Sequence, residues 1–237
     1  EIGKQREALL TLRADLDSQL GAIPMTGNIG VQLVFTDQSS SGVSSPGGVG
    51  AVRTPVSSGD SYAHVLPSMM LNFDVADNMK VRLGAARTLA RPRMDQLNAS
   101  SNASIANQPQ GALNSIFSGS GGNPQLRPYV ADGVDLSYEW YFGGEGYLAI
   151  AGYYKWLKDF VNPNAAVVRD FAYLVPSLSG DSLTAFNQSG QQTLGFVTGP
   201  DNGAEGHIAG IEATLALPFR MFAPGLDGFG FQTSASY

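Results

Sequence analysis

Ser182 is the residue whose neighbours come nearest to supporting nucleophilic catalysis, because it lies in the run Gly180-Asp181-Ser182-Leu183. A serine nucleophile needs a histidine base, and that base needs a carboxylate to orient it. The position three residues before His207 is Ala204 rather than an aspartate, and His64 lies upstream of the serine. The sequence therefore predicts no catalytic triad, and we do not expect an enzyme.

Metal, phosphate and nucleic-acid chemistry have little support in the composition. The chain has no cysteine and its two histidines share no ligand spacing with carboxylates, so we expect no metal and no cofactor. The glycine-rich residues 118–122 lack the lysine and the following helix of a phosphate loop, and we predict a flexible loop there. The formal net charge is −6 and no stripe of lysine and arginine could neutralise phosphates, so nucleic acid is not an expected partner.

A predicted β-hairpin over residues 132–158, with its turn at residues 143–145, dominates the chain. In its first arm every second residue is apolar, which is the period of a strand with one apolar and one polar face. The apolar set consists of Val134, Leu136, Tyr138, Trp140 and Phe142, and the second arm continues it with Leu148, Ile150, Tyr154 and Trp156. A long apolar face with aromatic residues towards its ends is typical of a strand that faces lipid in an outer-membrane barrel.

The same alternation predicts further strands on both sides of the hairpin, for a total of about eight. Residues 1–20 also fit a helix through their leucine spacing, but the alternation favours a strand. In residues 79–89, Lys80 and Arg82 lie opposite the apolar side chains, as they must if a lipid-facing cation near the midplane costs about 2–4 kcal/mol. The further strands cover Leu9–Asp17, Asn28–Asp37, Tyr62–Val75, Met79–Leu89, Glu205–Phe219 and Phe229–Tyr237.

Short and long connections alternate along the chain. Up-and-down membrane barrels have tight turns on the periplasmic rim and long loops on the extracellular rim. Only 14% of the residues are charged, and no run of about 18 apolar residues could form a transmembrane helix. The predicted fold class is therefore all-β, a transmembrane antiparallel up-and-down β-barrel. The short connections are 76–78, 143–145 and 220–228, and the long ones are 38–60, 90–131 and 159–204, the last with short strand patterns at 165–169 and 192–197.

Several short motifs, in order along nearly the whole chain, resemble the TonB-dependent receptors of Gram-negative outer membranes. They are Gly27-Asn28-Ile29-Gly30-Val31 with Thr36-Asp37-Gln38, Leu66-Pro67-Ser68, Arg87-Thr88-Leu89-Ala90-Arg91-Pro92, Asn123-Pro124-Gln125-Leu126-Arg127-Pro128, Asp135-Leu136-Ser137-Tyr138-Glu139-Trp140-Tyr141-Phe142, and Tyr154-Lys155 before Lys158-Asp159-Phe160.

The resemblance implies that residues 1–237 are about eight strands of a 22-stranded barrel, with the plug domain, the TonB box and the terminal strands absent. It also implies a place in the bacterial outer membrane, in contact with lipid, and uptake of a scarce nutrient driven through the TonB complex, which the missing plug region would contact. The family has no catalytic residues to carry over. We interpret the two proline-containing motifs as structural, because proline fixes the entry of a loop, and we expect Arg91 and Arg127 to pair with loop carboxylates.

Two sets of residues are candidates for the receptor's polar contacts. The side chains predicted to face the barrel lumen solvate the wall and contact the plug. The loop set offers aromatic platforms among asparagine, glutamine and serine, which suits an oligosaccharide better than an anionic ferric siderophore. A passive porin and a soluble β-sandwich that binds glycans remain the alternatives. The lumen set is Arg13, Lys80, Arg82, Asp135, Glu139, Lys155 and Glu212, and the loop set is Phe117, Phe171, Tyr173, Phe186 and Phe196.

Overall fold

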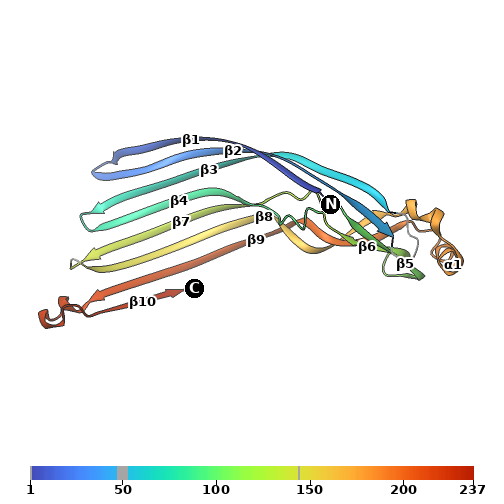
Figure 1. The fold of residues 1–237 in the computed structure, drawn as a ribbon. Coiled ribbons are helices and arrows are strands. Elements are labelled where there is room, and N and C mark those ends of the chain that lie inside the picture. Colours follow the sequence, from blue (N-terminus) through green and yellow to red (C-terminus); the bar gives the residue numbers. More distant parts are fainter. Residues whose placement is uncertain (1, 47–52, 144) are drawn as a thin grey trace.

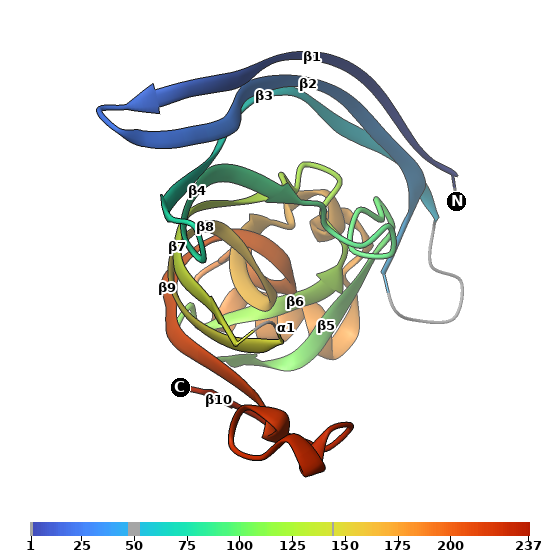
Figure 2. The same cartoon turned by 90° about the vertical axis from the view of Figure 1, so that its left-hand side faces the viewer.

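The chain folds into a single curved wall of long antiparallel strands (Figures 1 and 2). The computed structural model describes residues 2–46, 53–143 and 145–237. Consecutive wall strands are hydrogen-bonded neighbours, so the predicted all-β barrel segment is confirmed. The wall strands are β1 (Ile2–Leu20), β2 (Ile23–Pro46), β3 (Thr54–Ala76), β4 (Met79–Ala90), β7 (Tyr129–Phe142), β8 (Gly146–Asp170), β9 (Leu194–Pro218) and β10 (Gly230–Ser236).

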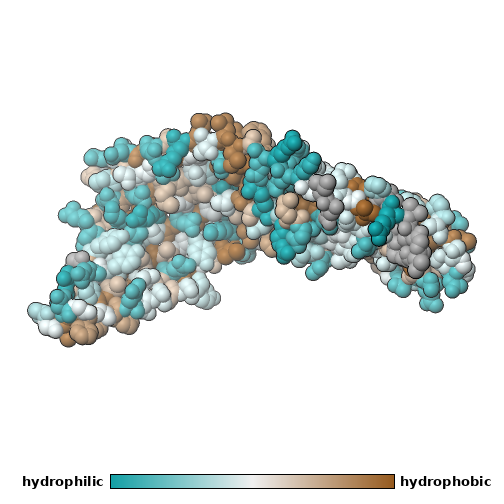
Figure 3. Space-filling view, viewed as in Figure 1, coloured by the Kyte–Doolittle hydropathy of each residue, from teal (hydrophilic) through white to brown (hydrophobic). Residues whose placement is uncertain are grey.

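The strand register places apolar residues beside apolar residues on the outer face of the wall. Leu136 of β7 lies opposite Leu83 of β4 and Gly152 of β8, and its side chain is 54% exposed. The neighbouring Ser137 lies opposite Arg82 on the inner face. Figure 3 looks onto the concave side, where hydrophilic side chains gather towards the end with the short turns. The two faces predicted from the alternation are therefore confirmed.

At one end of the wall the chain reverses within short turns. Gly21, between β1 and β2, has a φ of 66°, a left-handed conformation that glycine adopts without strain. The β3–β4 connection is equally tight, at residues 77–78. The turn between β9 and β10 is longer and contains two 3-10 helices, Phe219–Met221 and Pro224–Leu226.

The strands continue well beyond the predicted limits at the other end. Residues 38–60 were predicted to form a loop, but β2 runs to Pro46 and β3 begins at Thr54. Serine supports this extension because its hydroxyl can bond across the ladder, as between Ser41 and Ser57 at 3.1 Å. The strand patterns at 165–169 and 192–197 are continuations of β8 and β9. β1 begins at Ile2, so the helical alternative for the first residues is wrong.

A hairpin of β5 (Ser101–Gln110) and β6 (Ser115–Gly121) lies between β2 and β9 at the end of the wall away from the short turns, called the outer end below. β5 pairs in parallel with residues 44–46, and β6 pairs in parallel with residues 196–198. The flexible loop predicted at 118–122 is therefore wrong for most of its length. Gly119 permits the antiparallel pairing of β6 with β5, because a Cβ there would lie 2.8 Å from the Asn102 carbonyl oxygen.

The connection from β8 to β9 contains a 3-10 helix (Ala172–Ser177) and the helix α1 (Gly180–Gln188). The helix α1 was not predicted from the sequence. Its first turn is fixed by Ser182, whose hydroxyl donates to the Ser179 carbonyl oxygen at 2.8 Å and accepts from the Ser179 N–H at 3.2 Å. Ser182 therefore has a capping role. No helix in the described part of the chain is long and apolar enough to cross a membrane.

Candidate functional site

The long connections form a folded cap at the outer end of the wall, and its core is aromatic. Phe117 of β6 stacks on Phe171 with ring centroids 5.7 Å apart and meets Phe186 of α1 edge-on at 5.9 Å. The three residues are 3%, 3% and 5% exposed, and Ile116 and Leu174 pack with them. Such aromatic pairs contribute about 0.5–1.5 kcal/mol beyond their burial. These side chains hold β6, the 3-10 helix and α1 together.

The structure separates the five aromatic residues predicted to contact ligand. Phe117, Phe171 and Phe186 lie in the cap core and have no accessible ring face for a ligand. Tyr173 is 54% exposed and stacks on Phe171 at 6.2 Å, and Phe196 of β9 is half-buried opposite Ser118. Tyr173 and Phe196 are therefore the accessible members of the set.

The proline motif at residues 123–128 forms a clamp on the inner side of the wall. Gln38 of β2, 3% exposed, donates from Nε2 to the carbonyl oxygens of Pro124 and Leu126 at 2.9 and 2.6 Å. On the other side, Asn202 of β9 accepts from the Arg127 N–H at 2.8 Å and donates to the Arg127 carbonyl oxygen at 2.9 Å. The motif thus links β2 to β9, as its structural interpretation predicts.

Both arginines of the proline motifs form ion pairs. Arg127 Nε lies 2.8 Å from Asp60 Oδ2, and Arg91 Nη2 lies 2.7 Å from Glu7 Oε2. The hydrogen bond from Arg127, with its positive charge, holds the pKa of Asp60 below the usual 3.8. Asp60 lies on the extension of β3 beyond the predicted membrane span. The expected pairs form, but the carboxylates lie on strands β3 and β1 rather than in loops.

A polar hollow of about 430 Å³ lies beside this clamp, between the segment that follows β4 and the β5–β6 hairpin. Neutral amides and hydroxyls dominate its lining. The cation Arg93 is paired with Asp95 at 2.8 Å, so the two charges offset each other. The run of asparagine and serine at residues 98–102 is the sequence signal that could have predicted this hollow. The lining is Arg93, Asp95, Gln96, Asn98, Ser100, Ser101, Asn102, Ser120, Gly121, Gly122, Pro163 and Pro200.

Two of the residues predicted to face the lumen, Arg82 and Glu139, form a polar network towards the short-turn end. Arg82 donates from Nε and Nη2 to the two oxygens of Glu139 at 2.7 and 3.1 Å, and from Nη1 to Asn72 at 3.1 Å. The Tyr141 hydroxyl donates to Glu139 at 2.7 Å. The structure brings Arg82 and Glu139 together. Further along the same face, Asp135, Arg13, Lys155 and Glu212 are exposed, and Lys80 lies 2.9 Å from Asp74.

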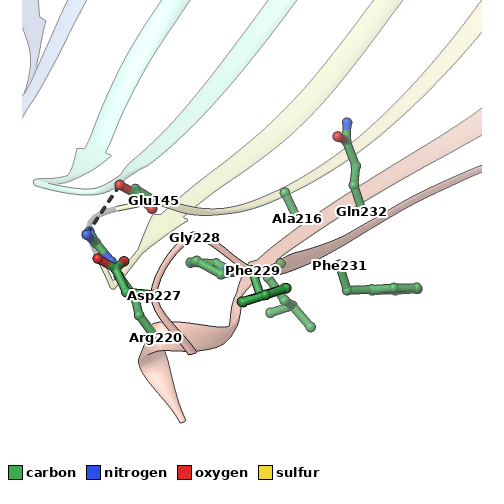
Figure 4. Close-up of a pocket in the computed structure, with 11 residues that line it drawn as sticks. Glu145, Ala216, Arg220, Asp227, Gly228, Phe229, Phe231 and Gln232 are labelled. Carbon is green, nitrogen blue, oxygen red and sulfur yellow. Dashed lines mark ion pairs between the residues drawn. The ribbon is translucent and has the colours of Figure 1, made fainter. Parts of the chain in front are cut away.

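A second hollow, of about 360 Å³, lies at the opposite end of the wall, between the last two short turns (Figure 4). Arg220 and Glu145 form an ion pair across it at 3.3 Å, and Phe229 and Phe231 line it. The hollow is open to solvent and belongs to the rim of short turns. Among the described residues, no group of three or more histidine, cysteine, aspartate or glutamate side chains is placed to hold a metal ion.

A curved wall of antiparallel strands, apolar outside and polar inside, with short turns at one end and folded connections at the other, defines an outer-membrane β-barrel. The sequence model of the TonB-dependent receptor-like β-barrel matches residues 10–237. The chain belongs to this family of outer-membrane receptors and transporters. In that membrane the short turns face the periplasm and the cap faces the outside of the cell.

Solved structures of siderophore receptors share the fold. A mutant ferric enterobactin receptor from Pseudomonas aeruginosa matches with a TM-score of 0.55 and 15% identity, over 99% of this chain and 35% of that one. Another mutant of that receptor, in complex with enterobactin, matches with a TM-score of 0.52 and 14% identity, over 99% and 36%. The chain therefore spans about a third of the length of these receptors, and identity this low shows the fold alone. A search of curated proteins found no match.

Proposed function

We propose that this chain is one part of a longer receptor, which takes up a scarce polar nutrient with energy passed from the TonB complex. A plug domain outside these residues would receive that energy. The observation that carries the proposal is the folded cap with its polar hollow, at the end of the wall that faces outward. Family membership favours this function over a passive porin or a soluble β-sandwich.

We infer that the ligand is neutral and rich in hydroxyl groups, as an oligosaccharide is. Asn102 of β5 and Ser120 of β6 lie opposite each other in the hairpin and line the hollow, where both are exposed. Amides and hydroxyls of this kind donate and accept hydrogen bonds without requiring a charge on the ligand. Of the accessible loop aromatics, Tyr173 is the candidate for a platform beneath a sugar ring.

A ferric siderophore is the second candidate, and the specific observation that favours it is the shared fold with ferric enterobactin receptors. An anionic chelate requires cations that are not already paired. In the hollow, Arg93 is matched by Asp95, and Arg127 nearby is matched by Asp60. These pairings favour the neutral ligand over the anionic one.

The test is calorimetric titration of the purified full-length receptor with a panel of neutral oligosaccharides and with a ferric catecholate. We expect saturable binding of one oligosaccharide class, weakened about tenfold by Asn102→Ala, which is the effect of about one lost hydrogen bond. Asn107→Ala is the matched control, because Asn107 is an exposed asparagine of β5 outside the hollow.

Two results would count against this account. Saturable binding of the ferric catecholate with no oligosaccharide binding would contradict the neutral ligand and identify an anionic siderophore instead. Uptake by cells that continues after the proton gradient is collapsed would contradict energised transport and point to a passive pore.

A further inference from the structure

Three charged side chains of the neighbouring strands β4, β7 and β8 lie on the lipid-facing side of the wall, in line with apolar residues of the same strands. Arg87 is the next alternate residue of β4 after Val81, Leu83 and Ala85, so it lies on their outward face. It is opposite Asp132 of β7. Lys158 of β8 lies on the same face, opposite Val130. The lumen network does not explain them, because they point to the other face of the strands.

These side chains form one cluster. Arg87 Nε and Nη2 donate to the two oxygens of Asp132 at 2.6 and 3.0 Å, and Lys158 Nζ lies 3.4 Å from Asp132 Oδ2. Two cations share one carboxylate, which leaves one positive charge uncompensated within the cluster. The side chains of Arg87 and Lys158 are 40% and 53% exposed, so their remaining N–H groups are accessible from the membrane side.

The cluster lies at the outer edge of the apolar band. At about 3.3 Å per residue and a strand tilt of about 40°, the stretch of β4 from Met79 to Arg87 rises about 20 Å, close to the height of about 25 Å expected for such a band. Between these positions the outward residues of β4 are uncharged, as are those of β7 from Val134 to Trp140.

Aromatic residues of an interfacial belt lie directly beside the charges. Trp156 is opposite Asp132 on β8, and its ring lies 4.4 Å from that of Tyr154, which in turn stacks on His207 of β9 at 5.7 Å. Tryptophan and tyrosine collect at the level of lipid headgroups because one end of each ring system is apolar and the other polar. The positive charge is therefore at headgroup depth.

We propose that Arg87 and Lys158 form a binding site for the phosphate-bearing headgroup of an outer-leaflet lipid, with Asp132 fixing the two cations in place. Arginine and lysine are the side chains that bind phosphate, and the exposed donors of this cluster are directed towards the membrane rather than the lumen. The acyl chains of that lipid would lie along the apolar outer residues Leu136 and Ile150. This site is independent of the ligand that the receptor transports.

The experiment is native mass spectrometry of the full-length receptor in detergent, titrated with bis-phosphorylated lipid A. Each cation near an anionic lipid is worth a factor of about five, so Arg87→Gln with Lys158→Gln is expected to weaken binding about thirtyfold and Lys158→Gln alone about fivefold. The matched control is Lys155→Gln, which removes an exposed cation of β8 from the lumen face and leaves lipid binding unchanged.

Asp132→Asn distinguishes a lipid site from a purely structural ion pair. Asparagine still offers an acceptor oxygen to the two cations but no longer offsets their charge, so binding of lipid A is expected to become tighter, whereas a purely structural ion pair predicts unchanged binding. The proposal is overturned if the double variant and Lys155→Gln retain lipid A equally, or if a lipid of the same acyl chains without phosphate binds as tightly.

Discussion

Replacing Gln38 with methionine tests whether the proline motif is held in the way the structure shows. Methionine fills a similar space but donates no hydrogen bond, so the carbonyl oxygens of Pro124 and Leu126 lose their donor. Both residues are buried, Leu126 with 0% exposure, and water cannot readily replace the lost amide. A buried carbonyl left without a partner costs about 1–3 kcal/mol, so the loss of both bonds in Gln38→Met is expected to destabilise the clamp by about 2–6 kcal/mol.

Hydrogen–deuterium exchange of the full-length receptor measures this local opening. The protection of the amides of residues 125–127 is expected to fall by a factor of at least about 30, since 1.4 kcal/mol corresponds to tenfold. Gln32→Met is the control, because Gln32 lies on the same face of β2 but is not a hydrogen-bond partner of the motif in the described structure. Equal protection in the two variants would refute the clamp.

The pH dependence of the same amides tests the ion pair between Asp60 and Arg127. Arg127 holds the pKa of Asp60 below 3.8, so the stabilisation is fully present above pH 3.8 and is lost as the pH falls through the lowered pKa. Protection of residues 125–127 is therefore expected to drop below about pH 4 in the native receptor. In Asp60→Asn it should already be reduced at neutral pH and should lack that acid step.

Two further predictions concern the lumen network and the cap. Arg82→Met leaves Glu139, whose side chain is 12% exposed, without its cation, and we expect a loss of about 1–2 kcal/mol in urea unfolding from lipid vesicles; Arg13→Met, which breaks a pair that is 62% and 71% exposed, should cost less than about 0.5 kcal/mol. Phe117→Ala opens the cap core at a cost of about 3–5 kcal/mol and should make residues 171–193 sensitive to protease, whereas Tyr173→Ala should not; equal sensitivity would contradict the role of the cap core.

The wall could be predicted from the sequence because each of its strands keeps a strict period of two. Leu136 and Ser137 are neighbours in the chain and lie on opposite faces of β7. A shift of the strand register by one residue would turn the apolar side chains to the lumen and the polar ones to the lipid. The same rule placed Lys80 and Arg82 in the lumen. A charge on the lipid face at Arg87 was not predicted, because Arg87 has the same parity as the apolar residues of β4 and lies at the edge of the apolar band.

The outer end could not be predicted in the same way, because its pairing depends on hydroxyl groups and backbone rather than on apolar alternation. Residues 38–46 of β2 contain serine where the earlier part of the strand has leucine and valine. Such a stretch has the composition of a loop although it pairs as a strand. Phe117 and Phe171 were predicted to be exposed because their neighbours in sequence are polar. Phe117 is buried against Phe186 of α1, a helix that was not predicted, and Phe171 stacks on Phe117 in the same cluster.

The most direct test of the barrel interpretation is to place a lysine on each face of β7 in the full-length receptor and to measure its assembly in the outer membrane by the heat-dependent shift of the folded band. Leu136→Lys puts the charge among Leu83 and Gly152 on the lipid face, at a cost of about 2–4 kcal/mol, and should block assembly. Ser137→Lys puts the same charge in the lumen and should assemble normally. Equal assembly of the two variants would contradict the assignment of the faces.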